Sequence, residues 1–183
     1  MKIIGITGSI ASGKTTVAHL MAGKKYPLFS ADAIVSNLYR KKYFNKILVK
    51  KFKLSSKEKI KDQIKLILKY NLKKLESIIH PLVRKEMTKF LKKKNKLLFL
   101  EIPLLIESKL DKHFDKLIFV EAKKKLRLKR YLKKKGDKKI FSLLDKRQLS
   151  SASKRNICDY TINNNFSLAI LRKNVKNFIK KYE

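Results

Sequence analysis

Residues 2–20 read KIIGITGSIASGKTTVAHL, in which a short apolar run leads through Gly8 and Gly13 into a helical pattern. The segment GSIASGKT at 8–15 satisfies the pattern G-x-x-x-x-G-K-[ST]. Glycines at these positions permit turns in which successive backbone N–H groups converge on phosphate oxygens, and the following helix adds its positive N-terminal end. The stretch therefore predicts a strand, a polyphosphate-binding loop and a helix.

Two side chains at the end of this loop, Lys14 and Thr15, have different expected roles. Lys14 is expected to reach the β- and γ-phosphates of a nucleotide, and the Thr15 hydroxyl to coordinate Mg²⁺. A glycine turn with a solvated lysine would need no ligand, but the strand pattern before the motif and the helical pattern after it favour phosphate binding. The residues expected to contact the nucleotide are Gly8, Ala11, Ser12, Gly13, Lys14, Thr15 and Thr16.

Four further apolar runs predict strands of a buried parallel sheet. They lie at 26–31, 96–102, 116–122 and 159–163, and the first and last are weaker. Helical patterns separate them, among them 14–23 and an amphipathic segment at 166–182. Strands that alternate with helices indicate an α/β fold with a mainly parallel sheet.

Two segments break this alternation. Between Ala33 and Asn95 the sequence shows Lys-rich helical periodicity without a convincing strand. We therefore expect one domain at 1–183 with a helical substrate-side insertion at 40–95. Residues 123–151 contain two basic helical patterns hinged near Gly136-Asp137, which is typical of a mobile lid. The predicted core comprises 1–39, 96–122 and 152–183.

The composition narrows the class of protein. No apolar run approaches the roughly 18 residues of a membrane span, and the start MKIIGITG enters a strand pattern without a cleavable signal. The single cysteine, Cys158, excludes an intramolecular disulfide and a Cys-rich metal site. We therefore expect a cytoplasmic protein without a membrane partner.

The chain carries 48 Lys+Arg against 14 Asp+Glu, which gives a formal net charge of +34. Such a charge can bind nucleic acid by neutralising backbone phosphates. The basic residues are mostly lysines spread along the chain, however, and Lys, Asn, Ile and Phe are frequent throughout. This distribution favours a general compositional bias of the chain as the cause of the charge over a dedicated nucleic-acid-binding surface. The charge would in either case attract anionic substrates.

Asp32 follows the second predicted strand. Residues at the carboxyl ends of neighbouring parallel strands share one crevice, so this carboxylate could orient an acceptor hydroxyl and accept its proton. It could equally be the N-cap of a helix at 33–39.

The class of nucleotide-binding protein can be narrowed by what the sequence lacks. No Asn-Lys-x-Asp guanine-recognition motif is present, and a motor ATPase would need a longer chain. A small phosphotransferase is therefore indicated.

Five motifs, in order along the chain, resemble the dephospho-coenzyme A kinase family. They are the loop at 8–15, ADAI at 31–34, HPLV at 80–83, EIPLLIE at 101–107, and QLS at 148–150 followed by CDYTINNN at 158–165. The loop is generic to many kinases, whereas the His-Pro-Leu and Pro-Leu-Leu-x-Glu motifs are more specific. The resemblance implies ATP- and Mg²⁺-dependent phosphorylation of the ribose 3′-hydroxyl of dephospho-coenzyme A. It also implies a three-layer P-loop kinase fold with a five-stranded parallel sheet, a helical substrate-binding subdomain and a lid.

The resemblance implies roles for individual residues. Asp32 would face the 3′-hydroxyl as base or orienting group, while Lys14 and Arg130 would act on the transferred phosphoryl group. Glu101 and Thr15 would contact Mg²⁺. The remaining candidates are the substrate-binding residues His80, Pro103, Leu104 and Glu107, and Asn164 at the adenine of ATP.

Some of these residues have structural alternatives. His80-Pro81 could end one helix and begin another, because Pro favours the first helical turn. Glu107 could cap the following helix, and Asn164 could belong to a plain turn. Arg127, Arg147 and Arg155 could line the lid or be solvated. The chain departs from the family pattern at Ser9 and Ala11 (glycine is common), Ser30 and Glu101 (Asp is usual), and Lys134 (Arg is usual).

Two other functions stay open at this point. A nucleoside or nucleoside-monophosphate kinase would share the loop, the lid and the size. A nucleic-acid-binding ATPase would account for the charge, but the basic runs contain few aromatic residues. The sequence does not indicate an oligomeric state.

Overall fold

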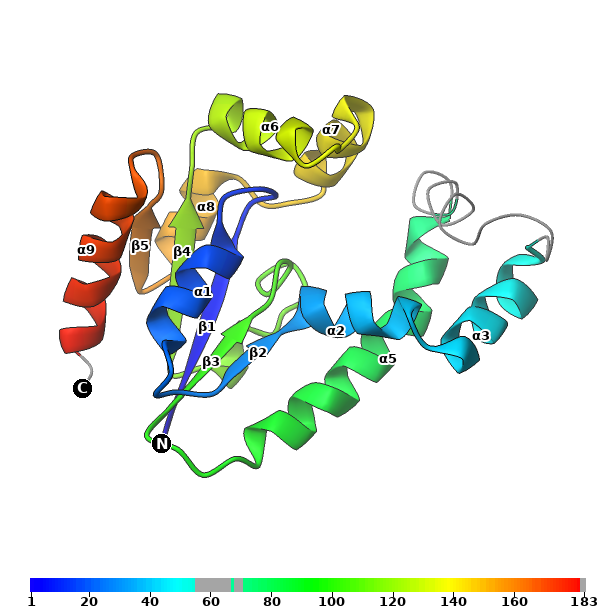
Figure 1. Ribbon diagram of the computed structural model, residues 1–183, viewed down its shortest axis with the longest axis horizontal. Helices are drawn as coiled ribbons and strands as arrows, with labels where there is room; N and C mark the ends of the chain where they lie inside the picture. The colour runs from blue at the N-terminus through cyan, green and yellow to red at the C-terminus, as the bar shows by residue number, and fades with distance from the viewer. Residues whose placement is uncertain (55–66, 68–70, 182–183) are drawn as a thin grey trace. The chain divides into compact units, whose positions relative to one another are not determined.

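The computed structural model describes residues 1–54, 67 and 71–181. Within them, five parallel strands form one sheet in the order β2-β3-β1-β4-β5 (Figure 1). The strands are β1 (Lys2–Gly8), β2 (Leu28–Ser30), β3 (Leu97–Glu101), β4 (Lys116–Glu121) and β5 (Tyr160–Asn163). Each coincides with one of the predicted apolar runs, so the predicted parallel sheet is confirmed.

Helices connect the strands. In chain order those described are α1 (Lys14–Ala22), α2 (Ala31–Tyr39), α3 (Lys42–Phe52), α5 (Leu72–Leu91), α6 (Lys124–Lys133), α7 (Lys138–Lys146), α8 (Ser151–Ile157) and α9 (Leu168–Lys180). A short 3-10 turn, η1 (Asp111–His113), lies in the loop after β3. The two basic helices predicted around Gly136-Asp137 are α6 and α7, and the Asp137 side chain caps α7 by accepting from the Ile140 N–H.

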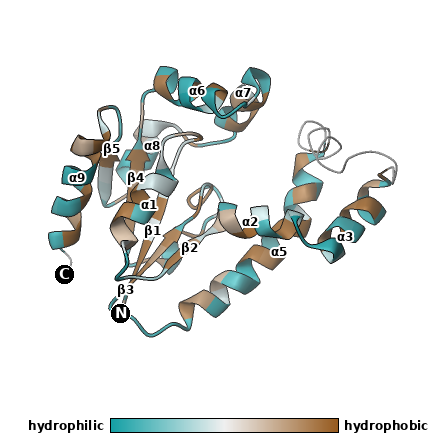
Figure 2. Cartoon of the chain, viewed as in Figure 1, coloured by the Kyte–Doolittle hydropathy of each residue, from teal (hydrophilic) through white to brown (hydrophobic). Residues whose placement is uncertain are grey.

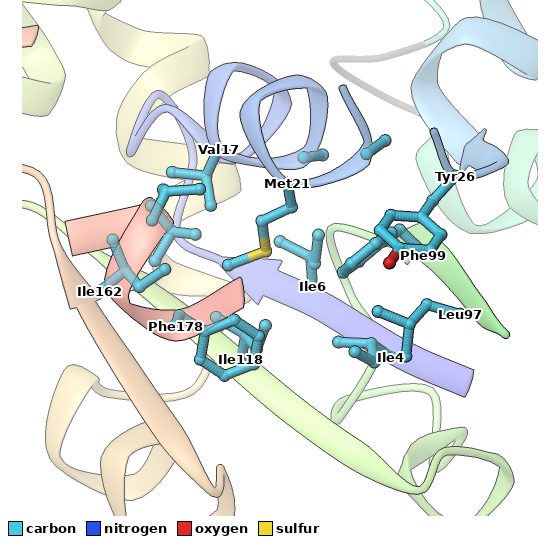
Figure 3. Close-up of a cluster of buried hydrophobic side chains, with 14 of the residues drawn as sticks. Ile4, Ile6, Val17, Met21, Tyr26, Leu97, Phe99, Ile118, Ile162 and Phe178 are labelled. Atoms are coloured by element: carbon cyan, nitrogen blue, oxygen red, sulfur yellow. The ribbon is translucent and has the colours of Figure 1, made fainter. Parts of the chain in front are cut away.

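The main hydrophobic cluster lies on one face of the sheet, where α1 and α9 cover it (Figure 3). Ile4 and Ile6 of β1 are fully buried there, against Met21 of α1 and Phe178 of α9. Successive side chains of a strand point to opposite faces, so Gly5 faces the other side of the sheet. The packing anchors both β1 and α1, and therefore fixes the two ends of the predicted phosphate-binding loop.

The other face of the sheet is covered by the loop after β3 and by α8, which packs on β4. A Cβ atom on Gly5 would lie 2.8 Å from a Leu105 methyl and 2.9 Å from the Phe114 ring. The missing side chain therefore lets this loop approach β1 closely. The sheet and the segments on its two faces form the three layers expected of the α/β class.

The chain divides into two compact units, 1–30 with 94–183, and 31–93. The second unit begins at Ala31, earlier than the boundary at 40 predicted for the helical insertion. Its core is formed by α2, α3 and α5, which contribute Leu38, Phe44 and Leu75 to one buried cluster. No strand occurs in the described residues of this unit. The rest of its predicted helical pattern, 55–66 and 68–70, lies outside the described residues.

Two of the structural alternatives that the sequence left open are wrong: the helix boundary at His80-Pro81 and the N-cap role of Asp32. Pro81 lies inside α5, which runs unbroken from Leu72 to Leu91, so His80-Pro81 does not end one helix and begin another. Asp32 lies in the first turn of α2, which starts at Ala31, and it is therefore a helical residue and not the N-cap. A carboxylate in the first turn still favours the helix, because the N-terminal end of the helix dipole is positive.

Figure 2 shows apolar residues concentrated in the strands, while the helices carry both hydrophobic and hydrophilic residues. This distribution agrees with a sheet buried on both faces and helices half-exposed to water. Among the residues that the structure describes, we find no helix with the length and apolar character needed to cross a membrane.

Candidate active site

The loop between β1 and α1 has a backbone conformation suited to anion binding. Gly13, the N-cap of α1, has φ 95° and ψ 22°, and Ala11 has φ 58°. Residues in the left-handed region can turn successive N–H groups toward one side and so form a concave anion site. The first N–H groups of α1 add to it, because they have no acceptor within the helix.

Both motif glycines are required by the path of the chain. A Cβ atom on Gly8 would lie 2.6 Å from the Val120 carbonyl oxygen, and one on Gly13 would collide with the Asn164 side-chain amide. Any other residue would displace β4 or the segment after β5 from the loop. The glycines therefore let the ends of β4 and β5 approach the loop closely.

Two polar side chains of the loop are buried. Lys14 is 7% exposed, and its Nζ donates to the Ser9 carbonyl oxygen at 3.4 Å. Ser12 is fully buried, and its Oγ has no hydrogen-bond partner in the described part of the chain. A buried hydroxyl without a partner costs about 1–3 kcal/mol. An orphaned donor beside the N–H groups of the loop fits a site that receives an anionic ligand.

Glu101, at the end of β3, connects the loop to the neighbouring strand. It is fully buried, and its Oε1 accepts a hydrogen bond from the Thr15 hydroxyl at 2.7 Å, while its Oε2 accepts one from Ser30 at 2.7 Å. The two predicted metal ligands, Thr15 and Glu101, are therefore in direct contact. No cluster of three or more His, Cys, Asp or Glu occurs in the described residues. Mg²⁺ commonly takes one or two protein ligands and completes its shell with water and phosphate oxygens, so this pair fits Mg²⁺.

Arg130 and Asn164 contact the backbone of the loop at Ser12. The Asn164 Nδ2 donates to the Ser12 carbonyl oxygen at 2.8 Å. The Arg130 guanidinium donates to the Asn164 carbonyl at 3.0 Å and lies 3.4 Å from the Ser12 carbonyl. Burial lowers the pKa of Arg130, but an arginine remains charged at neutral pH. The structure thus brings Arg130 of α6 to the loop, whereas the lid role of α6 and the adenine contact of Asn164 stay predictions.

Glu107 makes its described contacts within the protein. Its Oε1 accepts from the Leu149 N–H at 2.9 Å and lies 2.9 Å from the Nζ of Lys154, a fully buried lysine. The Lys154 Nζ meets no acceptor with hydrogen-bond geometry in the described residues, so this contact is an ion pair. The Oε2 of Glu107 is buried without a partner there and is the atom left for another ligand.

The other substrate candidates belong to different units. Pro103 and Leu104 lie half-buried in the loop after β3, where the Thr7 hydroxyl donates to the Pro103 carbonyl at 3.3 Å. Asp32 and His80 lie in the unit 31–93, on α2 and α5, and both side chains are exposed. The proposed roles of these four residues stay predictions.

For Arg127 the sequence left open a place along the lid or a solvated position, and the structure excludes the solvated one. This residue is only 5% exposed and donates to the carbonyl oxygens of Ala122 at 3.1 Å and Ile10 at 3.3 Å. Its Nη1 also pairs with Asp145 at 2.7 Å. Gln148 accepts from the Ile10 N–H at 2.8 Å. No local signal distinguishes this arginine among 48 basic residues, because its partners are brought together only by the fold.

A phosphate-binding loop that joins the first strand of a parallel sheet to its first helix, with basic helices folded against that loop, defines a P-loop kinase. The chain has this fold and these elements. The family model described as dephospho-CoA kinase matches residues 2–169, and the chain belongs to this family. The resemblance seen in the five motifs is thereby confirmed.

Similar proteins agree with this assignment. A dephospho-CoA kinase of Fusobacterium nucleatum is 36% identical over 96% of this chain and 96% of that protein. The crystal structure of a Thermus thermophilus protein aligns with a TM-score of 0.79 and 27% identity, covering 100% of this chain and 98% of that one. The dephospho-CoA kinase from Campylobacter jejuni aligns with a TM-score of 0.65 and 26% identity, covering 100% and 97%.

Proposed function

We propose that the chain transfers the γ-phosphoryl group of ATP to the ribose 3′-hydroxyl of dephospho-coenzyme A, giving coenzyme A and ADP. The observation that carries the proposal is a complete phosphate-binding loop in a chain that matches the dephospho-CoA kinase family over residues 2–169. The high positive charge supports it, because both reactants are anionic.

Phosphoryl transfer depends mainly on positioning and on stabilising charge at the phosphoryl oxygens. The N–H groups of the loop and of the start of α1 would hold the phosphates. Lys14 and Arg130 would neutralise the charge on the transferred group. The contacts of Arg130 with Ser12 and Asn164 support this role, because they hold its guanidinium at the loop.

Thr15 and Glu101 would hold Mg²⁺. The Thr15 hydroxyl can offer an oxygen lone pair to a cation while it donates its hydrogen to Glu101, so the observed hydrogen bond would orient that lone pair. Bound Mg²⁺ would supply charge neutralisation at the phosphate oxygens. Ser30 would hold the second carboxylate oxygen in place.

Asp32 would orient the 3′-hydroxyl of the acceptor and accept its proton. It follows Ser30 by two residues, and Ser30 is bonded to Glu101 at the carboxyl end of β3. This proximity along the chain supports the assignment. The remaining substrate contacts are assigned to His80, Pro103, Leu104 and the Oε2 of Glu107.

A coupled assay of ADP release with a panel of acceptors tests the proposal. We expect dephospho-coenzyme A to stimulate ADP release far more than nucleosides, nucleoside monophosphates, RNA or DNA. A nucleoside or nucleoside monophosphate as the best acceptor would reject the substrate and favour the alternative kinase. Stimulation by RNA or DNA alone would instead support a nucleic-acid-dependent ATPase.

A further inference from the structure

Both backbone polar groups of Ile10, at the tip of the phosphate-binding loop, are bound by side chains of the segment 123–151. The Ile10 N–H donates to the Gln148 Oε1 at 2.8 Å, and the Ile10 carbonyl accepts from the Arg127 Nη1 at 3.3 Å. Figure 1 shows α6 and α7, which belong to this segment, beside the β1–α1 loop. The tip of the loop is therefore attached to the lid.

Several contacts besides the one to Ile10 hold the Arg127 guanidinium in place. Its Nε donates to the Ala122 carbonyl at the end of β4, its Nη1 pairs with Asp145 of α7, and its guanidinium lies 5.7 Å from the centre of the Phe141 ring. A buried charge is tolerated only when it is paired and hydrogen-bonded. These contacts fix the guanidinium and so leave the Ile10 carbonyl little freedom to move.

The next residue shows what this anchoring achieves. Ala11 has φ 58°, a conformation that costs an L-residue free energy and persists only where the surroundings impose it. Gly13, two residues on, adopts positive φ at no such cost. The Ser12 N–H donates to the Ser9 carbonyl at 3.0 Å and closes a turn with Ile10 and Ala11 at its two central positions. The contacts of Arg127 and Gln148 hold Ile10, the residue directly before Ala11 in that turn.

We propose that Arg127 and Gln148 are positioning residues of the phosphate-binding loop: by holding Ile10 they keep Ala11 in the left-handed conformation in which the N–H groups of the loop converge on a nucleotide phosphate. The inference rests on the proposed nucleotide binding at this loop. It assigns neither residue a contact with substrate. It predicts that losing either contact weakens nucleotide binding through the backbone of the loop.

The test is the dissociation constant of ADP, measured by calorimetry on the full chain. Arg127→Met keeps the long apolar stem and leaves Asp145 paired with Lys124, which lies 3.1 Å away. Gln148→Met removes the other contact from a half-buried position. We expect each variant to bind ADP about tenfold more weakly, as the loss of one hydrogen bond in a charge-assisted network implies.

Lys124→Met is the matched control, because Lys124 also pairs with Asp145 but is 70% exposed and has no described contact with the loop. Its ADP affinity should stay within about twofold of the wild type. Recovery of ADP affinity by a second substitution distinguishes positioning of the loop from a general structural effect. In the Arg127→Met background, Ala11→Gly should restore most of the lost affinity, since glycine adopts positive φ without strain.

Unchanged ADP affinity in Arg127→Met and Gln148→Met, in a wild type that binds ADP, would overturn this inference alone. Equal weakening in the Lys124→Met control, or failure of Ala11→Gly to rescue, would overturn it as well. If Arg127→Met does not fold, Gln148→Met with and without Ala11→Gly decides the question. Absence of ADP binding by the wild type would overturn the proposed function and this inference together.

Discussion

Ala11 has a backbone conformation that suits glycine better than alanine. Its φ of 58° lies in the left-handed region, which costs an L-residue about 1–2 kcal/mol. The sequence indicated a departure here, because glycine is common at this position in the family. It did not predict the positive φ, since that depends on the turn that the Ser12 N–H closes onto the Ser9 carbonyl and, as proposed above, on the contacts of Arg127 and Gln148 with Ile10.

Ala11→Gly is expected to raise the free energy of unfolding by about 0.5–1 kcal/mol. The relief of strain exceeds the extra entropy that glycine gives to the unfolded chain, which is about 0.4–1 kcal/mol. Urea denaturation measures the change. Lys53→Gly is the control, because Lys53 has φ 51° at the end of α3, in the unit 31–93, and should gain a similar amount. A loss of stability in Ala11→Gly alone would contradict the account.

Asp32→Asn and Lys14→Ala separate activation of the acceptor hydroxyl from binding of the ATP phosphates. Asp32→Asn should lower kcat by about 10²–10⁴ while leaving ATP affinity close to that of the wild type, because a general base acts on the acceptor. Lys14→Ala should weaken ATP binding and transfer together. Steady-state kinetics and nucleotide titration measure both quantities. Wild-type turnover in Asp32→Asn would show that this carboxylate is not the base.

Among the helices, α5 departs from the rule that a proline marks a helix boundary. Pro81 lies at its tenth position and lacks the N–H that would bond to the Ser77 carbonyl. The helix continues because Leu75 and Ile79 are buried in the core of the unit 31–93 and Phe90 is buried nearer its end. Tertiary packing therefore overrides the local preference, which a reading of the sequence alone could not anticipate.

Pro81→Ala is expected to stabilise the protein by about 1–3 kcal/mol, because it restores the missing hydrogen bond and removes the proline clash within α5. Thermal or urea unfolding measures the gain. Destabilisation by Pro81→Ala would contradict this account of α5.

The strands were predictable because each is a short apolar run, and parallel strands buried on both faces have that pattern. The phosphate-binding loop was predictable because its residues lie in one contiguous segment of the sequence, at a spacing that phosphate binding requires. The contacts of Arg127 and the pair between Glu107 and Lys154 were not. Their partners lie far apart in the sequence, and no periodicity marks a side chain whose partners are brought together only by the fold.

At the scale of the whole molecule, the net charge of +34 makes each carboxylate contact important for stability at low pH. Burial raises the pKa of Asp159, but hydrogen bonds from Lys116 and from the Leu117 N–H outweigh it and lower the pKa overall. At Asp145, burial is outweighed in the same way by Arg127 and Lys124.

The free energy of unfolding should therefore fall on acidification. A folded-state pKa below the unfolded value, about 4, gives a contribution that is complete above that pH and is lost as the pH falls through the folded pKa. Urea denaturation between pH 7 and pH 3 measures it, with the steep decline expected below about pH 4. Asp159→Asn should make the decline shallower. Parallel curves for the variant and the wild type would contradict the assignment.

The most direct test of the central claim is phosphorus NMR of the product formed from ATP and dephospho-coenzyme A by the wild-type protein. The account predicts ADP and, in equal amount, one new phosphomonoester on the ribose 3′-oxygen, with much less of both formed by Lys14→Ala. ATP consumed without phosphate on the acceptor, or phosphate at another position, would contradict it.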